Sequence, residues 1–257
     1  MVEINNELCI GCMSCRRVCP LKVIDADRDT VTVRNPQYCI SCGHCASVCP
    51  QNAIRGMAPV SQMGIPLEDG QAFPESEIER LMVTRRSIRC YQNKEVEKKK
   101  ISRLIYLANQ APTAVNREKS RFVAVGRTGC AELEIMAQDY FLKKEDGKIS
   151  GLITNSGYKI LLGAPALIGI CNRKEFGTWD SALAAQNLAL AAHSMGLGTC
   201  FAGIFNRAYR DCAGIQSYFN TGKEYEMQMF MVLGYPDPGI KYRHSIERAR
   251  PEITWLG

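Results

Sequence analysis

The pattern of apolar and polar positions along the chain predicts a mixture of helices and short strands. A first helix is expected to begin near Ser76 and run to about Thr84, with Glu79 as its capping-box partner. A second is expected over about Val96–Gln110, where apolar residues recur at the spacing of one helix face. Short apolar runs bounded by glycine or proline predict three buried strands, at Arg121–Val125, Ala166–Cys171 and Met229–Leu233.

The segment Asp180–Met195 has a different pattern, because it is alanine-rich and apolar on nearly all of its sides. Gly196 follows it as a C-cap. A helix with this pattern is expected to be buried around its whole circumference. In a domain of this size, that predicts a central helix at a subunit interface. Together the predicted elements indicate the α+β class.

Residues 58–75 interrupt the regular patterning. They carry three prolines and two glycines without periodicity, which is typical of a linker. We therefore expect a small cysteine-rich domain over residues 1–57, a linker over 58–75 and a larger α+β domain over 76–257.

The small domain contains two runs of cysteine with the same spacing, C-x2-C-x2-C-x3-C-P, repeated with a period of 30 residues. The x2 spacings let one loop hold three corners of a cubane cluster, while the cysteine before the proline reaches the neighbouring cluster. The predicted ligand sets are therefore crossed between the runs: Cys9, Cys12, Cys15 and Cys49 for one [4Fe–4S] cluster, and Cys39, Cys42, Cys45 and Cys19 for the other.

Zinc sites and disulfides are the alternatives for these cysteines. Zinc motifs normally bring two pairs of ligands, and structural disulfides need an oxidising compartment. The amino terminus lacks the pattern of a signal peptide, and the longest apolar stretch, Ile160–Ile170, is too short to cross a bilayer. We therefore expect a cytoplasmic protein without a membrane segment. With their spacing, residues 1 to about 57 resemble the bacterial two-cluster ferredoxins.

The chain has a formal net charge of +6, which raises the question of a nucleic-acid partner. No aromatic and basic recognition module accompanies the basic residues, so nucleic acid is not expected. Thr84–Arg89 instead places three guanidinium groups and one serine hydroxyl just beyond the first helix, and guanidinium groups bind phosphate bidentately.

Three further motifs follow this arginine-rich segment. They are Ala111–Asn116 after the second helix, Gly196–Gly203 after the apolar helix, and Gly234–Pro236 after the last strand, which leads to Arg243, Arg248 and Arg250. In this order and spacing, the four motifs resemble the nitroreductase family of FMN enzymes. The whole chain resembles the subfamily in which a ferredoxin domain precedes the nitroreductase domain.

The resemblance implies where FMN binds. The family's opening motif contacts the phosphate and ribityl chain, a proline-serine-x-x-asparagine loop reaches the flavin of the other subunit of a homodimer, and a glycine loop lies beside the isoalloxazine ring. A basic pair near the carboxyl terminus completes the phosphate pocket. The opening motif falls on Arg85, Arg86, Ser87 and Arg89, and the proline-containing loop falls on Pro112, Thr113, Ala114 and Asn116. The glycine loop falls on Gly198, Thr199, Cys200 and Gly203. The basic pair falls on Arg248 and Arg250, and Arg243 is the alternative if the alignment shifts.

The resemblance also implies an iron–sulfur flavoenzyme. Single electrons would enter at the clusters, pass to FMN and leave as a hydride equivalent from flavin N5, with no acid–base residue assigned. The expected acceptor is a small organic molecule, nitroaromatic or quinone-like. The expected donor is a ferredoxin-like protein or NAD(P)H.

Two departures from the family pattern leave the acceptor open. Arg117-Glu118-Lys119 stands where the family usually has Gln-Pro-Trp, and Phe201 stands where a tryptophan often follows the cysteine-like position in the glycine loop. Reduction of an activated double bond or of a carbon–halogen bond on the same flavin is therefore an alternative. A non-catalytic electron-transfer module for a partner protein is another.

Overall fold

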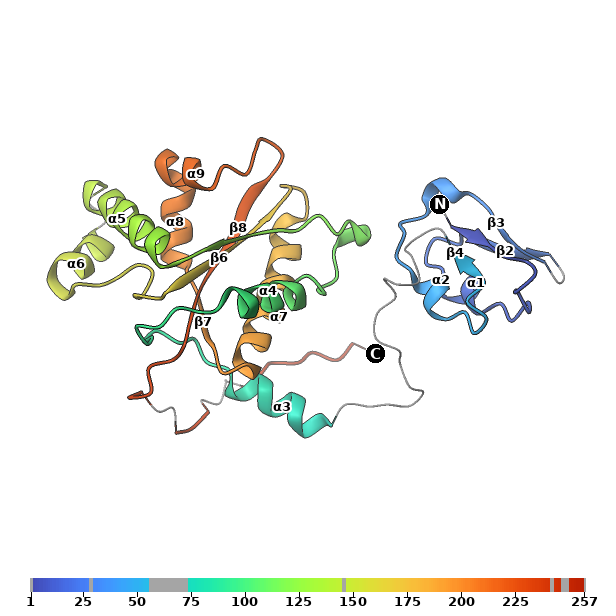
Figure 1. Cartoon of the computed structure of the whole chain (residues 1–257), viewed down its shortest axis with the longest axis horizontal. Coiled ribbons are helices and arrows are strands. Elements are labelled where there is room, and N and C mark those ends of the chain that lie inside the picture. Colours follow the sequence, from blue (N-terminus) through green and yellow to red (C-terminus); the bar gives the residue numbers. More distant parts are fainter. Residues whose placement is uncertain are drawn as a thin grey trace. The chain divides into compact units, whose positions relative to one another are not determined.

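The computed structural model describes residues 2–27, 30–55, 74–144, 147–240, 243–245 and 250–256. The chain divides into two compact units (Figure 1). The first unit comprises Met1–Ala72 together with Val115–Arg117, and the second comprises Phe73–Ala114 and Glu118–Gly257. Of the predicted linker, residues 58–73 lie outside the described residues. Within the described part of the chain, no helix combines the length and the apolarity needed to span a bilayer.

The two sequence repeats of the first unit are interleaved in space. Strand β1 (Glu3–Ile4) pairs antiparallel with β4 (Ile54–Arg55), and β2 (Ile24–Asp27) pairs antiparallel with β3 (Thr30–Val33). Each of these two-stranded sheets therefore takes one strand from each repeat. Short helices α1 (Ser14–Val18) and α2 (His44–Ser47) occupy equivalent places in the two halves, and a 3-10 turn spans Pro36–Tyr38.

The backbone repeats as the sequence does. Left-handed φ values recur 30 residues apart, at Met13 and Gly43 (62° and 76°) and at Lys22 and Asn52 (53° and 50°). A side chain makes this conformation unfavourable, so its recurrence at non-glycine positions indicates that the turns are imposed by the surrounding fold. The core beneath the turns is small, and its buried aliphatic members are Val2, Val23, Ile24, Val31 and Ile54.

The second unit is built on a four-stranded antiparallel sheet in the order β5-β6-β8-β7. The strands are β5 (Arg121–Val125), β6 (Ala166–Asn172), β7 (Gly198–Phe201) and β8 (Glu226–Gly234). The helices are α3 (Glu75–Thr84), α4 (Lys98–Ala108), α5 (Arg127–Lys143), α6 (Gly147–Ser156), α7 (Gly177–Ser194), α8 (Gly203–Asp211) and α9 (Ala213–Phe219), with a 3-10 turn at Ala114–Asn116.

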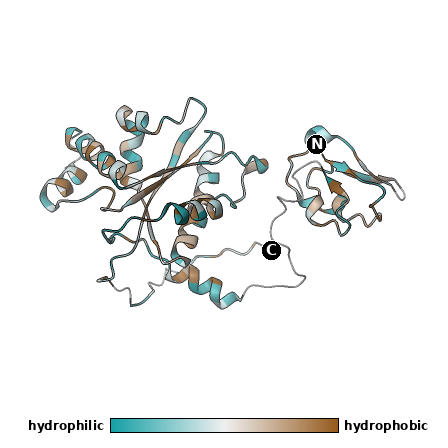
Figure 2. Ribbon diagram, viewed as in Figure 1, coloured by the Kyte–Doolittle hydropathy of each residue, from teal (hydrophilic) through white to brown (hydrophobic). Residues whose placement is uncertain are grey.

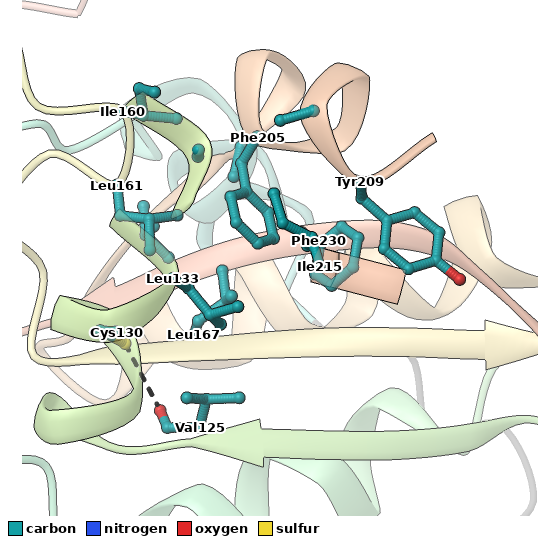
Figure 3. Packing of buried hydrophobic residues seen from close by; sticks show 14 of the residues in the cluster. Val125, Cys130, Leu133, Ile160, Leu161, Leu167, Phe205, Tyr209, Ile215 and Phe230 are labelled. Atoms are coloured by element: carbon teal, nitrogen blue, oxygen red, sulfur yellow. Dashed lines mark hydrogen bonds between the residues drawn. The ribbon is translucent and has the colours of Figure 1, made fainter. Parts of the chain in front are cut away.

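Helices cover both faces of this sheet, and every residue of β6 is buried. Alternate residues of β6 point to opposite faces, as a strand requires: Leu167 packs with α5, α6, α8 and α9, while Ile168 packs with α4 and α7. Figure 2 shows apolar residues gathered along the strands. Figure 3 shows the first of these cores, where the rings of Phe205 and Phe230 meet edge-on with centroids 4.9 Å apart.

The predicted α+β class and the strand positions are confirmed, and β5 has the predicted bounds. The predicted cap of the first helix is wrong. Helix α3 begins at Glu75, one residue before the predicted start, and Pro74 occupies the N-cap position without a side-chain hydrogen bond. Ser76 lies inside the first turn and so cannot be the N-cap, while Glu75 and Glu77 in that turn interact favourably with the positive end of the helix dipole.

The alanine-rich helix is α7, and it is longer at its start than predicted. It ends as expected, with Gly196 in the left-handed conformation that closes a helix (φ 71°). Within the single chain one face of α7 packs on the sheet through residues such as Leu188. On the opposite side, Trp179 is 72% exposed and Leu183 is 47% exposed.

Candidate functional sites

Two cavities in the first unit are each lined by four of the repeated cysteines. One is lined by Cys9, Cys12, Cys15 and Cys49. The other is lined by Cys19, Cys39, Cys42 and Cys45. Each cavity takes three cysteines from one run and one from the other. The structure thus brings each predicted ligand set together, while the role of these sulfurs as ligands stays a prediction.

The interleaved fold positions these cysteines. Cys15 and Cys45 lie in the first turns of α1 and α2, each only 8% exposed. The last cysteine of each run accepts a backbone hydrogen bond from four residues further on: Val23 N–H to Cys19 Sγ and Ala53 N–H to Cys49 Sγ, both 3.2 Å. The two halves of the unit therefore orient their last cysteine in the same way.

The donor sets suit an iron–sulfur cluster better than a single metal ion. Among the described residues, no three His, Cys, Asp or Glu side chains converge closely enough to bind one ion. A cubane is larger than one ion and needs its four sulfurs farther apart. Burial raises the pKa of Cys45 to about 11 and also raises the pKa of Cys15. Such thiols become thiolates at neutral pH when a metal centre binds them.

In the second unit, the fold brings three of the four motifs together. Ser87 and Thr199 form a parallel bridge, and Ile88 N–H donates to the Thr199 carbonyl at 2.9 Å. A few residues later, Gln92 N–H donates to the Tyr235 carbonyl, also at 2.9 Å. The arginine-rich segment therefore lies beside β7 and beside the residues that follow β8.

Gly198 is needed at this junction for steric reasons. It is buried, and a Cβ on Gly198 would lie 2.6 Å from Cβ of Ile88. A contact that short does not occur between real side chains, so only glycine lets the arginine-rich segment approach β7 this closely. Thr199 is 3% exposed, Cys200 is 8% exposed, and Gly203 begins α8.

Two side chains for which the sequence offered no role in a site interact electrostatically with arginines of this segment. Thr84 Oγ1 lies 2.9 Å from His193 Nε2, and burial together with the Arg85 charge lowers the pKa of His193, which favours a neutral imidazole. Burial raises the pKa of Tyr158, with Cys200 adding to the effect and the Arg89 charge opposing it. The phenol of Tyr158 is therefore within electrostatic range of both predicted site residues.

Tyr158 is held in place by a residue distant in sequence. The two carboxylate oxygens of Glu134, in α5, accept hydrogen bonds from Ile160 N–H and Leu161 N–H, each at 2.7 Å. This fixes the segment that carries Tyr158 against α5. No local motif marks Tyr158 or Glu134, so sequence reasoning missed both.

The loop Pro112–Ala114 is anchored to the first turn of α7. Ala114 N–H donates to Asp180 Oδ1 at 3.0 Å, and Glu118 N–H donates to Thr113 Oγ1 at 3.0 Å. Asp180 is only 8% exposed, and a carboxylate near a helix N-terminus is favoured by the helix dipole. Asn116 belongs to the first unit.

Of the three carboxyl-terminal arginines, the structure describes only Arg243 and Arg250. Arg248 lies outside the described residues. Arg243 and Arg250 are both exposed, and the described residues include no hydrogen-bond or ion-pair partner for either. Which of the three completes a phosphate site stays a prediction.

Two family models match the chain. Residues 82–235 match the model described as the nitroreductase family, and residues 8–54 match the 4Fe-4S dicluster domain. The first match spans more than half of the chain. The resemblance stated from the sequence is thereby confirmed for both parts.

Two relatives align with more than half of this chain. Each is provisionally named NADH dehydrogenase/NAD(P)H nitroreductase. The one from Methanothermobacter thermautotrophicus is 30% identical over 165 residues, which are 62% of this chain and 78% of the relative. The one from Archaeoglobus fulgidus is 25% identical over 180 residues, which are 67% of this chain and 93% of the relative.

Solved structures confirm the fold of the second unit. A nitroreductase with bound FMN from Bacteroides fragilis has a TM-score of 0.63 at 22% identity, covering 70% of this chain and 99% of that chain. A nitroreductase with bound FMN from Desulfitobacterium hafniense has a TM-score of 0.60 at 21% identity, covering 70% and 98%.

Proposed function

The chain belongs to the nitroreductase family, and from that premise we propose that it is an FMN-dependent oxidoreductase supplied with electrons by two [4Fe–4S] clusters. The observation that carries the proposal is the union of a 4Fe-4S dicluster domain and a nitroreductase domain in one chain. Cubane clusters pass one electron at a time, whereas a flavin holds two. The chain would accept single electrons and deliver them in pairs to a small organic acceptor, nitroaromatic or quinone-like.

The cysteines around each cavity would hold one cluster. The crossed sets are supported by the grouping of Cys9, Cys12, Cys15 and Cys49 around one cavity and of Cys19, Cys39, Cys42 and Cys45 around the other. We propose residues 1–57 as the ferredoxin domain, 58–75 as the linker and 76–257 as the flavin domain.

The arginine-rich segment and β7 would hold FMN. Arg85, Arg86 and Arg89 supply donors that match a phosphate, and Ser87 supplies a hydroxyl. The absence of a side chain at Gly203 leaves the backbone at the start of α8 open to a planar ring, while Gly198 lets the arginine-rich segment lie against β7. Bound FMN would supply hydride transfer to the acceptor. The chain's own residues would bind the phosphate, orient the ring and exclude water.

A homodimer is part of the proposal. The single chain leaves two large apolar side chains of α7, Trp179 and Leu183, exposed to water, and exposed apolar side chains that lie together on one face often mark an interface. A second copy of the chain would cover them. The Pro112–Asn116 loop, anchored on the same helix through Asp180, would then contribute to the flavin site of the other subunit.

The proposal is tested by cofactor analysis and donor assays on one anaerobic preparation. We expect about eight irons and eight labile sulfides per chain, the content of two cubanes, with FMN as the flavin. Reduced ferredoxin, dithionite, NADH and NADPH are then compared as donors to a panel of nitroaromatic, quinone, enone and organohalide acceptors. Turnover of one acceptor class supports an enzyme and identifies its substrate. Full reduction of the flavin without turnover of any acceptor would favour an electron-transfer module.

A further inference from the structure

The second unit contains a cavity that lies outside the predicted flavin motifs. Its volume is about 350 Å³, within the range of roughly 300–1,000 Å³ that small-molecule pockets span. It is lined by α4 and the residues just before it, the end of β5, the start of α5 and the start of β6. The proposed FMN and cluster sites use none of the residues that line it.

The sequence of β5 explains why space remains beneath α4. Alternate residues of a strand share one face, so Phe122 and Ala124 face the same side of the sheet. Phe122 packs against the cluster that contains Leu104 of α4. The methyl group of Ala124 is much smaller than the ring of Phe122, and Ile101 and Ile105 of α4 therefore line the cavity half-buried rather than packed on the strand.

The floor of the cavity is apolar. Besides the two isoleucines it includes Val96, which is 7% exposed, Ala166, which is 2% exposed, and Pro165. Water in contact with these groups finds few polar partners. Covering this surface with the apolar part of a ligand would therefore be favourable.

The rim of the cavity is positively charged. Lys98 and Arg127 line it together with one carboxylate, Glu95. Arg127 Nε lies 3.9 Å from Glu95 Oε1, which is too far for a hydrogen bond. The Glu95 side chain is 78% exposed and can turn towards water, whereas the Arg127 side chain is 37% exposed. The rim thus offers an anion two cations, one of them a guanidinium fork that matches a carboxylate.

We propose that this cavity is a second ligand site, which binds a small organic carboxylate with an apolar body. The carboxylate would accept hydrogen bonds from Arg127, with the Lys98 ammonium and the Ser102 hydroxyl beside it. The apolar body would lie against Ile101 and Ala166. The site is additional to the proposed flavin site and does not depend on it.

Calorimetric titration of the full-length, FMN-loaded holoprotein with octanoate tests the proposal. We expect one octanoate to bind per chain. Acetate lacks the apolar body and octan-1-ol lacks the charge, so each should bind about tenfold more weakly or worse. Arg127→Gln should weaken octanoate binding by about tenfold, because a hydrogen bond to a charged group is lost. Arg103→Gln changes an exposed arginine of α4 outside the cavity and should leave the affinity unchanged.

A second variant tests the location without changing any charge. Ala124→Phe fills the cavity from β5 and should abolish octanoate binding. Ala124 is exposed and β5 is an edge strand of its sheet, so we expect this variant to fold. Ile101→Trp fills the same space from α4 and replaces it if it does not.

No octanoate binding to the wild type would overturn the proposal, as would wild-type affinity in either Arg127→Gln or the cavity-filling variant. Iron and FMN contents are measured on the same samples. If both are as expected while octanoate fails to bind, the proposed function stands and only the second site is disproved.

Discussion

Ile88 donates its backbone N–H to the carbonyl oxygen of Thr199 at 2.9 Å, and this bond joins two motifs that lie far apart in the sequence. It holds the arginine-rich segment along the edge strand β7. The charged groups that would bind a phosphate and the backbone that would lie beside a flavin ring are therefore fixed to each other. A substitution at this junction should therefore affect both phosphate binding and the placement of the flavin ring.

Replacing Arg85 or Arg89 with alanine should weaken FMN binding by about tenfold or more, because a hydrogen bond to a charged group contributes about 1.5–3 kcal/mol. FMN affinity is measured by fluorescence titration of the flavin-free protein. Arg103→Ala, an exposed arginine on α4, is the matched control and should leave the affinity unchanged. Equal affinity in all three variants would show that the segment is ordinary surface.

Gly198→Ala should destabilise the second unit, because its Cβ would lie 2.6 Å from Cβ of Ile88. Overpacking of this kind costs about 1–3 kcal/mol, and chemical denaturation followed by circular dichroism measures it. Gly147→Ala is the control, since no atom lies within 4 Å of the added Cβ. Equal stability of the two variants would mean that the junction tolerates a side chain.

Cys19→Ser should remove the cluster assigned to Cys39, Cys42 and Cys45, not the one nearest in sequence. Iron content should fall towards half, and alkylation with mass spectrometry should show which cysteines become reactive. Cys90→Ser changes an exposed cysteine outside the runs and should leave the iron content unchanged. Release of Cys9, Cys12 and Cys15 instead would disprove the crossed assignment.

The ion pair between Lys144, at the end of α5, and Asp211, at the end of α8, should make the stability of the second unit sensitive to acid. Lys144 Nζ lies 2.8 Å from Asp211 Oδ2, and hydrogen bonds from Lys144 and Tyr140 lower the pKa of Asp211 below its ordinary value of 3.8. A carboxyl whose pKa is depressed on folding stabilises the protein above its unfolded pKa, and that contribution is lost as pH falls through the folded pKa.

Asp211→Asn should therefore reduce stability near neutral pH and flatten its decline below about pH 4. The pair is exposed, so the effect should be small and should diminish in high salt. Urea denaturation at several pH values measures it. Asp139→Asn, a nearby exposed carboxylate, serves as the control. Identical pH profiles for Asp211→Asn and the wild type would contradict the expectation.

Shared flavin sites can be tested by mixing two variants, each assayed at an FMN concentration too low to fill its altered site. Arg85→Ala and Asn116→Ala chains, unfolded and refolded together, should regain about one quarter of wild-type activity, because half of the dimers are mixed and one of their two sites is intact. Mixing Arg85→Ala with Arg89→Ala should restore nothing, since both changes fall on the same side of the site. A monomer that keeps FMN and activity would contradict the dimer.

The sequence predicted the helices and strands whose local hydrophobic pattern is sufficient to identify them. β5 and β6 are apolar runs between glycine and proline signals, and α7 is apolar enough to be recognised alone. Helix α5 was missed because its buried face, which includes Leu133 and Phe141, is mixed with the exposed apolar residues Ile135 and Leu142. Its hydrophobic periodicity is therefore weak.

The remaining features depend on contacts between segments that lie far apart in the sequence. β7 is only four residues long and begins with Gly198, which has low strand propensity, and it is a strand because it pairs with β8. The position of Tyr158 near Arg89 depends on the Glu134 carboxylate, and such a long-range contact leaves no local pattern. The grouping of the cysteines around the two cavities, by contrast, could be anticipated, because the spacing of the cysteines along the chain limits which of them can lie together.

The interleaving of the two halves bears on how the chain is made. β1 has no partner until β4 has been synthesised, and the cavity of Cys9, Cys12 and Cys15 lacks its fourth cysteine until Cys49 emerges. Under the proposed crossed assignment, neither cluster would have its four cysteines until the second run has been translated. Iron and sulfide would then be delivered only after that point, and the thiols of the first run would stay without metal until then.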